Sequence, residues 1–307
     1  MTTAGTPQGT TAAPDTFAIG GDLPVHRLGY GAMQITGKGI WGPPADHDGA
    51  IAVLRRAMEL GVDFIDTADS YGPGISEELI AEALYPYPDD LAIATKAGFT
   101  RTGPGKWHVL GFPEYLKQQA ELSLRRLRVD TIDLFQLHRV DTRIPLAEQL
   151  GALVELQQEG KIGRIGLSEV TVAQLEEALT ITPIATVQNL YNVGNRTSEP
   201  LLDACAARGI GFIPWFPVQT GDLAAPGGLL AELSTATGHT PAQLALAWLL
   251  ARSPVMLPIP GTKSVAHLEE NCAASSITLD PDTLAALDAL SPAGTDPART
   301  GVDVRRR

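Results

Sequence analysis

The feature of this sequence that most constrains its fold is an alternation of short apolar runs with amphipathic stretches. The apolar runs cover residues 27–31, 62–68, 91–98, 131–138, 162–168, 184–189, 210–215 and 255–260. The amphipathic stretches cover residues 46–60, 76–84, 113–127, 146–159, 171–180, 198–209, 241–252 and 264–274. The runs are typical of buried parallel strands, and the stretches are typical of helices packed on a sheet. Eight such units predict an α/β fold, a (β/α)8 TIM barrel.

The segments outside this alternation predict a hairpin, an extra helix and two tails. Residues 16–25 hold two short apolar runs around a Gly-Gly-Asp turn, so we expect an N-terminal β-hairpin that caps the bottom of the barrel. Residues 1–15 are small and polar and predict a disordered tail. We expect a single barrel domain over residues 16–290, with an extra helix near its C-terminal end, and a tail over residues 291–307.

The composition argues against several classes of function. The chain has 307 residues, with 23 Lys and Arg against 35 Asp and Glu, and a formal net charge of −12 at pH 7. A chain this acidic is repelled by nucleic acids and by anionic membranes. The sequence shows neither a secretory signal nor an apolar run of membrane-spanning length, so a cytoplasmic protein is expected. Its two cysteines lie in no Cys/His cluster, so no metal site is predicted.

Four polar side chains stand at or just after the ends of three consecutive predicted strands. Asp66 ends the second strand and Tyr71 follows five residues later, while Lys96 ends the third and His138 ends the fourth. The C-terminal strand ends of a parallel barrel meet at one mouth, where active sites of this fold lie. Each residue alone also fits a structural role, as a turn cap, a half-buried aromatic, a solvent-facing lysine or a core histidine. Together they favour a catalytic group, because such polar groups are costly in a buried strand unless paired.

The motifs around these residues resemble those of the aldo-keto reductase family. The resemblance covers about residues 27–290 and rests on FIDTADSYG, TKAG, QLH, GLS, QNLYN and IPGTKSVAHLEEN, in this order. The stretches GYGAMQITGKGIWGPP, YPYPDDL and IPGTKSVAHLEENCAA are most similar to bacterial members related to pyridoxal reductase. The resemblance implies an NADP-dependent oxidoreductase that uses NADPH to reduce an aldehyde or a ketone to an alcohol by hydride transfer. It also implies a small-molecule carbonyl substrate and a monomer.

The resemblance implies a catalytic role for each of the four strand-end residues. Tyr71 would donate the proton, and Lys96 would lower the pKa of that phenol below its usual value near 10, because a cation stabilises phenolate. Asp66 would hold the ammonium group of Lys96, and His138 would orient the substrate carbonyl. Glycine-rich stretches at residues 37–42 and 103–111 are expected to be loops at the mouth. The predicted substrate pocket is lined by Trp41, Tyr71, Trp107 and His138.

Cofactor binding is implied for several further positions. The family holds the nicotinamide carboxamide at positions that match Ser168 and Gln188, and stacks the ring on an aromatic side chain that matches Trp215. Lys263 and His267 stand where a 2′-phosphate would bind, at the start of a helix, and Glu270 and Asn271 match residues that hold adenine. The predicted cofactor-binding residues are Gly31, Ala32, Met33, Asp66, Ser168, Gln188, Trp215, Phe216, Pro217, Val218, Gly261, Thr262, Lys263, His267, Glu270 and Asn271.

The sequence departs from the family pattern at Glu169, where relatives carry Asn. A carboxylate can accept a hydrogen bond from the carboxamide NH₂ group but cannot donate one to its oxygen. Three hypotheses about function follow from the sequence: reduction of pyridoxal to pyridoxine, broad reduction of aromatic aldehydes, and an NADPH-binding redox sensor with little turnover. The complete catalytic set favours the two enzymes over the sensor.

Overall fold

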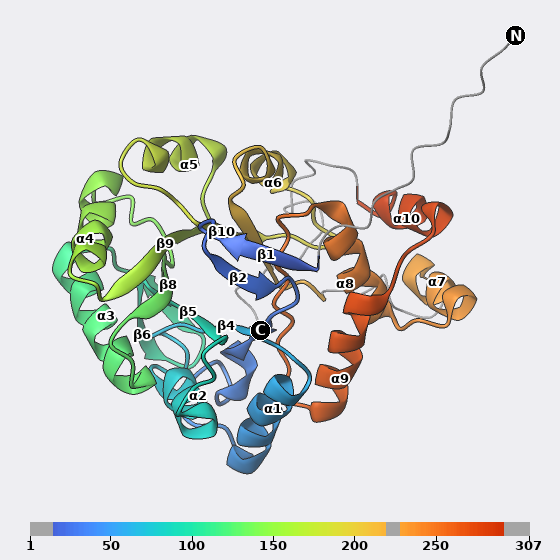
Figure 1. The fold of residues 1–307 in the computed structure, drawn as a ribbon, viewed down its shortest axis with the longest axis horizontal. Helices are drawn as coiled ribbons and strands as arrows, with labels where there is room; N and C mark the ends of the chain where they lie inside the picture. Colours follow the sequence, from blue (N-terminus) through green and yellow to red (C-terminus); the bar gives the residue numbers. More distant parts are fainter. Residues whose placement is uncertain (1–14, 219–227, 292–307) are drawn as a thin grey trace, which may run out of the picture.

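A closed ring of parallel strands surrounded by helices forms the centre of the protein, which the computed structural model describes over residues 15–218 and 228–291 (Figure 1). The sheet order within these residues is β11-β10-β9-β8-β5-β4-β3. The strands are β3 (Tyr30–Gly31), β4 (Phe64–Asp66), β5 (Ala92–Ala97), β8 (Ile132–Leu137), β9 (Ile162–Ser168), β10 (Thr186–Leu190) and β11 (Gly211–Trp215). All neighbouring strands run parallel, so their C-terminal ends lie at one rim.

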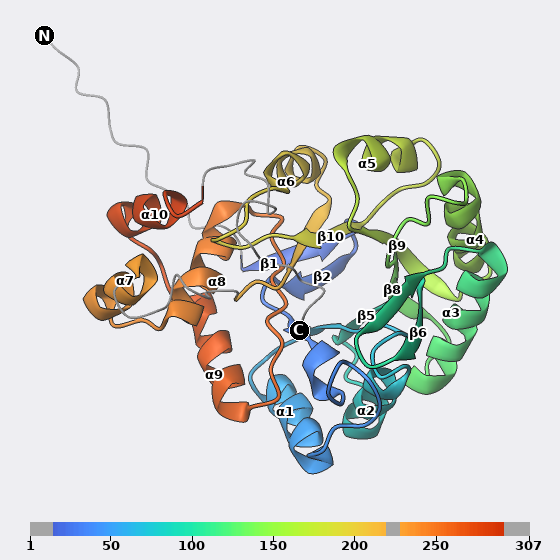
Figure 2. The same ribbon diagram turned by 180° about the vertical axis from the view of Figure 1, so that it is seen from behind.

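Helices pack around the outside of this ring, as the two opposite views in Figures 1 and 2 show. They are α1 (His47–Glu59), α2 (Ile75–Leu84), α3 (Pro113–Leu127), α4 (Leu146–Gln158), α5 (Val172–Leu179), α6 (Glu199–Ala206), α7 (Leu229–Thr237), α8 (Pro241–Arg252), α9 (Val265–Ala273) and α10 (Pro281–Asp288). Sequence signals set several of their ends. Thr171 and Thr240 each form a capping box with the glutamine three residues later. Helix α10 is the predicted extra helix.

The predicted eighth strand, residues 255–260, closes the ring without forming a regular strand. On one side Phe212 N donates to Val255 O and Leu257 N donates to Phe212 O, both at 2.8 Å. On the other side Gly29 N donates to Pro258 O at 3.0 Å. Two of the six residues are proline, which has no N–H to continue a ladder. The predicted barrel is confirmed, but the prediction of a regular eighth strand is wrong for this reason.

The N-terminal hairpin, β1 (Thr16–Ile19) and β2 (Leu23–His26), covers the end of the barrel where the strands begin. Figure 1 shows it lying across the ring. Its buried residues Ile19 and Val25 pack in one cluster with Phe64, the first residue of β4. The hairpin is also tied to that end by His26 N, which donates to Asp63 Oδ1 at 2.9 Å.

The structure contains elements that the sequence pattern did not predict. A second hairpin, β6 (Phe99–Gly103) and β7 (Lys106–Val109), follows β5 at the mouth, so the expectation of a plain loop over residues 103–111 is wrong. Cross-strand pairs such as Arg101 with Trp107 hold this hairpin together. Helix α7 is also additional, and the predicted tails lie almost wholly outside the described residues.

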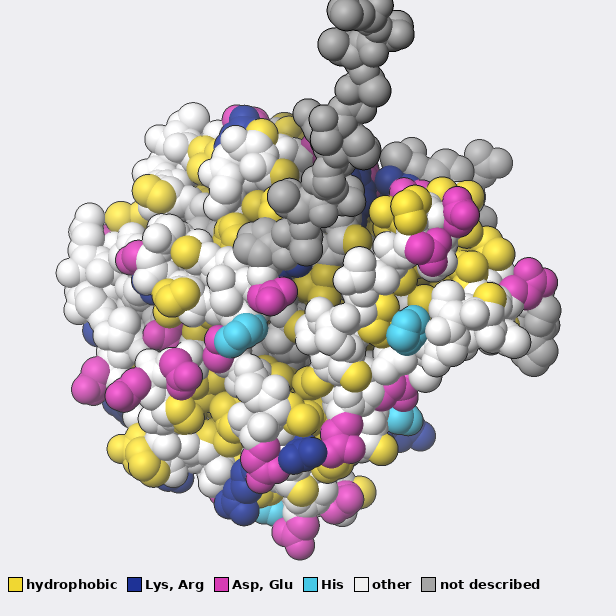
Figure 3. All heavy atoms as spheres, turned by 45° about the vertical axis from the view of Figure 1, so that its right-hand side comes forward, with side chains coloured by type: hydrophobic (Ala, Val, Ile, Leu, Met, Phe, Trp, Pro, Cys, Tyr) yellow, Lys and Arg dark blue, Asp and Glu magenta, His cyan; other side chains and the backbone are white. Residues whose placement is uncertain are grey.

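The outer surface carries charges of both signs. Acidic side chains are scattered over the face in Figure 3, with basic ones among them. Within the described ranges, none of the helices has the length and apolar character needed to cross a membrane.

Close backbone packing at the closure of the barrel requires glycine at two positions. A Cβ atom on Gly31 would lie 2.6 Å from Ile259 O, and one on Gly261 would lie 2.6 Å from Gly31 O. We predict that Gly31→Ala lowers the free energy of unfolding by about 1–3 kcal/mol, because backbone would have to move. Thermal unfolding followed by circular dichroism measures this.

A matched variant provides the control for this prediction. A Cβ on Gly151, inside α4, meets no atom within 4 Å. Gly151→Ala is therefore expected to leave the protein as stable, or to stabilise it by about 0.5–1 kcal/mol through helix propensity. Equal effects of the two substitutions would contradict the packing explanation.

Candidate active site

A buried ion pair joins the ends of β4 and β5. Lys96 Nζ lies 2.6 Å from Asp66 Oδ2 and donates to Thr67 O at 2.7 Å. The two side chains are 0% and 2% exposed. Asp66 Oδ1 also accepts from Gln136 Nε2 at 3.1 Å and from Gln188 Nε2 at 2.8 Å. These additional donors satisfy the carboxylate, which a buried ion pair requires if it is to be stable.

Tyr71 lies against this ion pair. Lys96 Nζ is 5.2 Å from the centre of the Tyr71 ring. Burial raises the pKa of Tyr71 above its ordinary value of 10.0, and the charge of Lys96 lowers it only in part. The expected net lowering is therefore wrong, although Lys96 acts in the expected direction. Burial lowers the pKa of Lys96, but Asp66 and Tyr71 together raise it above its ordinary value, so its ammonium group stays charged.

His138, directly after β8, lies beside Tyr71 as a neutral imidazole. The two ring centres are 5.9 Å apart, in an edge-to-face arrangement. Burial holds the pKa of His138 well below 6.5, and the charges of Lys96, Arg139 and Arg101 lower it further. Its Nδ1 lies 3.3 Å from Ser70 Oγ. A neutral imidazole has one donor and one acceptor nitrogen, so it can donate a hydrogen bond to a ligand while accepting one from the serine.

Aromatic side chains line the mouth next to Tyr71 and His138. The Trp107 ring centre lies 6.4 Å from each of those two rings, and Phe99 lies 4.7 Å from His138. The ring centre of Trp41 lies 5.9 Å from the guanidinium carbon of Arg101, which also stacks on Trp107. The predicted pocket residues Trp107, Tyr71 and His138 are thus together, and Phe99 is an aromatic neighbour that the sequence analysis missed.

Arg101 fastens the segments that form this mouth, and the sequence analysis missed it. Its guanidinium carbon stands 3.5 Å from the centre of the Trp107 ring and 5.9 Å from that of Trp41. It donates to Ser70 O at 2.7 Å and to Gly39 O at 2.9 Å. Arg101 therefore ties the β6–β7 hairpin to the segments after β3 and β4. The only sequence signal for this role was that Arg101 and Trp107 flank a Gly-Pro-Gly turn.

Three predicted cofactor residues lie on adjacent strands. Ser168 ends β9 and pairs in register with Gln188 of β10, and Trp215 ends β11. Gln188 uses its amide nitrogen on Asp66, and its Oε1 has no partner among the described residues. Ser168 Oγ accepts from Arg139 Nη1 at 3.0 Å. The indole of Trp215 is half-buried. These groups therefore form a polar edge beside a flat ring.

The other predicted cofactor residues lie along the same rim. Lys263 and His267 are exposed at the start of α9, where Ser264 caps the helix. The carbonyl of Thr262 accepts from Tyr30 OH at 2.6 Å. Ala32 and Met33 continue from β3 into the 3-10 helix Ala32–Ile35. The remaining positions are exposed Phe216, buried Pro217, Val218 packed on the core, Glu270 bonded to Thr240, and buried Asn271.

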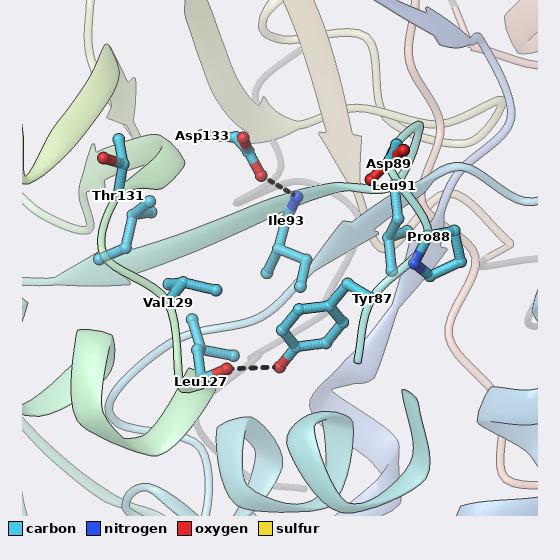
Figure 4. A pocket seen from close by; sticks show the side chains of 10 residues that line it. Tyr87, Pro88, Asp89, Leu91, Ile93, Leu127, Val129, Thr131 and Asp133 are labelled. Carbon is cyan, nitrogen blue, oxygen red and sulfur yellow. Dashed lines mark hydrogen bonds between the residues drawn. The ribbon is translucent and has the colours of Figure 1, made fainter. Parts of the chain in front are cut away.

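The described residues provide no metal cluster beside this site, and a cavity lies away from it. No group of three or more His, Cys, Asp or Glu side chains among them is arranged to hold a metal ion. A cavity of about 240 Å³ is lined by residues including Tyr87, Leu127 and Asp133. Figure 4 shows it beside the first residues of β5 and β8, at the end of the barrel away from Lys96 and His138.

Comparison with known proteins gives consistent results. The model of the aldo/keto reductase family matches residues 27–292. The chain is 51% identical over 268 residues to an uncharacterized oxidoreductase of Schizosaccharomyces pombe, covering 87% of each chain. It is 44% identical over 283 residues to pyridoxine 4-dehydrogenase of Escherichia coli, covering 90% of this chain and 98% of the relative. An aldo-keto reductase of Klebsiella pneumoniae, solved in complex with NADPH, superposes with a TM-score of 0.78 at 29% identity, covering 92% of this chain and 96% of that one.

The environment of His138 generates a prediction about pH. We expect its imidazole to stay neutral when the pH falls below 6.5. In contrast, the pKa of His47 is raised by a hydrogen bond that its ring donates to Glu82, so His47 becomes protonated. Nitrogen NMR of the labelled imidazoles distinguishes the two states. Because the pKa of His138 is lower in the folded than in the unfolded chain, its protonation favours unfolding, and stability falls as pH drops below about 6.5. Protonation of His138 at or above pH 6.5 would contradict this account.

Proposed function

Because the chain belongs to the aldo/keto reductase family, we propose that it is an NADPH-dependent reductase that converts pyridoxal to pyridoxine. The observation that carries the reductase chemistry is the buried pair of Lys96 and Asp66 against Tyr71. This arrangement places a phenolic proton next to a fixed positive charge, at the rim where barrel enzymes act. Broader reduction of aromatic aldehydes is the alternative outcome of the same chemistry.

Tyr71 is proposed to complete the reduction by donating its proton. NADPH, when bound, supplies a hydride to the carbonyl carbon. The oxygen that gains the electron pair takes the hydroxyl proton of Tyr71, and solvent later returns a proton to the phenolate. Lys96 Nζ stabilises that phenolate, and Asp66 keeps the ammonium group in place.

His138 is proposed to orient the carbonyl. Where its Nδ1 accepts from the Ser70 hydroxyl, Nε2 carries the hydrogen and is available to the substrate oxygen. A neutral imidazole donates this hydrogen bond without adding a competing charge. Hydrogen bonds from His138 and Tyr71 to one oxygen would fix the carbonyl plane relative to the cofactor.

The residues at the rim fit a nicotinamide dinucleotide phosphate. Gln188 Oε1 is an unpaired acceptor beside Ser168, and Trp215 offers a partly exposed ring. At the other end, exposed Lys263 and His267 stand at the N-terminus of α9, which attracts anions. These residues would hold the carboxamide, the nicotinamide ring and the 2′-phosphate.

The walls of the mouth support an aromatic aldehyde as substrate. Phe99 and Trp107 stand edge-on to His138 and form an aromatic wall beside it, on which a flat ring that carries an aldehyde could pack. Pyridoxal has this shape, and the Escherichia coli relative is named for the chemistry that interconverts pyridoxine and its aldehyde.

Replacement of the proposed proton donor tests the chemistry. We expect Tyr71→Phe to lower kcat for pyridoxal by about 100-fold or more, since general acid catalysis contributes about 10²–10⁴-fold. NADPH binding should be retained, because the ring remains. The measurement is NADPH oxidation by absorbance with pyridoxal, benzaldehyde and acetaldehyde. Tyr87→Phe is the matched control, since Tyr87 donates to Leu127 O at the other end of the barrel.

The pattern of activity decides between the hypotheses. Turnover that is highest with pyridoxal and lost only in Tyr71→Phe supports the proposal. Comparable turnover with every aromatic aldehyde supports a broad reductase instead. NADPH binding without turnover of any carbonyl compound would contradict the proposed enzymatic function and favour a redox sensor.

Lys263 generates a separate prediction about cofactor choice. We expect Lys263→Met to raise the KM for NADPH about tenfold or more and to leave the KM for NADH unchanged. A charged hydrogen bond to the 2′-phosphate contributes about 1.5–3 kcal/mol, and 1.4 kcal/mol is tenfold in affinity. Initial rates with both cofactors measure this. Equal changes for NADPH and NADH would contradict a phosphate contact.

A further inference from the structure

Glu169 adopts a backbone conformation that glutamate rarely occupies. Its φ is +55°, in the left-handed region that glycine and asparagine tolerate best. The residue follows Ser168 at the end of β9, where the sequence resemblance leads to an expectation of Asn. Keeping glutamate in this conformation costs free energy, so other contacts must compensate.

The carboxylate of Glu169 supplies those contacts by reaching two neighbouring strands. Its Oε1 accepts from Leu190 N at 2.7 Å and from Trp215 Nε1 at 2.5 Å. Its own backbone N–H donates to Gln188 O at 2.9 Å. The side chain thus turns toward the ends of β10 and β11, and its Oε1 is already engaged by the protein.

The indole of Trp215 has few other constraints. It is half-buried at the end of β11, and the following Phe216 also has a left-handed φ of +59°. The Trp215 and Phe216 rings meet only at a tilt, with centres 6.2 Å apart. The bond to Glu169 is therefore the directional contact that sets the plane of the indole.

Arg139 brings hydrogen-bond donors close to Ser168, where the carboxylate of Glu169 can only accept hydrogen bonds. One of its guanidinium nitrogens, Nη1, donates to Ser168 Oγ at 3.0 Å and to His138 O at 2.7 Å. Burial lowers the pKa of Arg139, and the nearby charge of Glu169 is the largest influence that raises it. The guanidinium group of Arg139 therefore lies next to the hydroxyl of Ser168, one of the two residues predicted to hold the carboxamide.

We infer that Glu169 is a positioning residue that fixes the indole plane of Trp215, while Arg139 donates to the carboxamide oxygen of the nicotinamide ring. This inference rests on the proposed function, because it assigns roles toward NADP(H). Glu169 and Arg139 would then share the role that the family assigns to one asparagine. Arg139 supplies the hydrogen-bond donor that a carboxylate cannot supply. Glu169 orients the Trp215 ring, which would stack on the nicotinamide.

A double-mutant cycle on cofactor binding tests the role of Glu169. The dissociation constant of NADP⁺ is measured by calorimetry for wild type, Glu169→Ala, Trp215→Phe and the double variant. We expect Glu169→Ala to weaken binding about tenfold in the wild-type background and not at all when Trp215 is already Phe. An undiminished effect in the Trp215→Phe background would overturn the positioning role.

A spectroscopic measurement without cofactor reports on the same link. Glu169→Ala should change the near-ultraviolet circular dichroism of the indole, whereas Glu169→Gln, which keeps an acceptor oxygen, should restore the signal and the binding of NADP⁺. Unchanged spectra in both variants would contradict the link. Far-ultraviolet spectra show that each variant is folded.

A cofactor analogue tests the role of Arg139. Thionicotinamide replaces the carboxamide oxygen by sulfur, a weaker acceptor. Wild type should bind NADP⁺ more tightly than the thio analogue, and Arg139→Met should abolish most of that preference. An unchanged ratio of the two dissociation constants in Arg139→Met would overturn this assignment. Failure of wild type to bind NADP⁺ at all would instead overturn the proposed function on which the inference rests.

Discussion

Lys96 and Asp66 carry opposite charges into a part of the barrel that excludes water. The pair is stable there because Thr67 O, Gln136 and Gln188 supply the remaining hydrogen bonds. This network has two consequences for the mouth. It holds an ammonium group under the Tyr71 phenol, and it uses the amide nitrogen of Gln188, which leaves that side chain's oxygen available to accept from a ligand.

The barrel makes this chemistry possible by bringing strand ends together. Asp66, Lys96, His138, Ser168, Gln188 and Trp215 come from consecutive positions around the ring. Close backbone packing at Gly31 and Gly261, together with backbone hydrogen bonds to residues 255–260, then closes the ring. The site therefore depends on the closure of the barrel as well as on the polar residues themselves.

The sequence predicted the barrel and the polar cluster at its rim, because strand periodicity places Asp66, Lys96 and His138 at one rim. It did not predict Phe99 and Arg101, since their contacts arise from a hairpin inserted after β5. It also misjudged the pKa of Tyr71, because the extent of burial depends on packing that no spacing reveals. Arg139 was missed for a related reason: its contact with Ser168 joins the segment after β8 to the end of the neighbouring strand β9.

Single-turnover NADPH oxidation with pyridoxal, measured against pH, tests most directly whether the ion pair tunes Tyr71 as the proposed proton donor. The comparison is between wild type and the Lys96→Met, Asp66→Asn double variant, which removes both charges and leaves no lone carboxylate buried. The account predicts a much slower reaction in the variant, with its alkaline decline moved to higher pH, because the charge of Lys96 lowers the pKa of the phenol. Wild-type rates with an unmoved alkaline decline would contradict it.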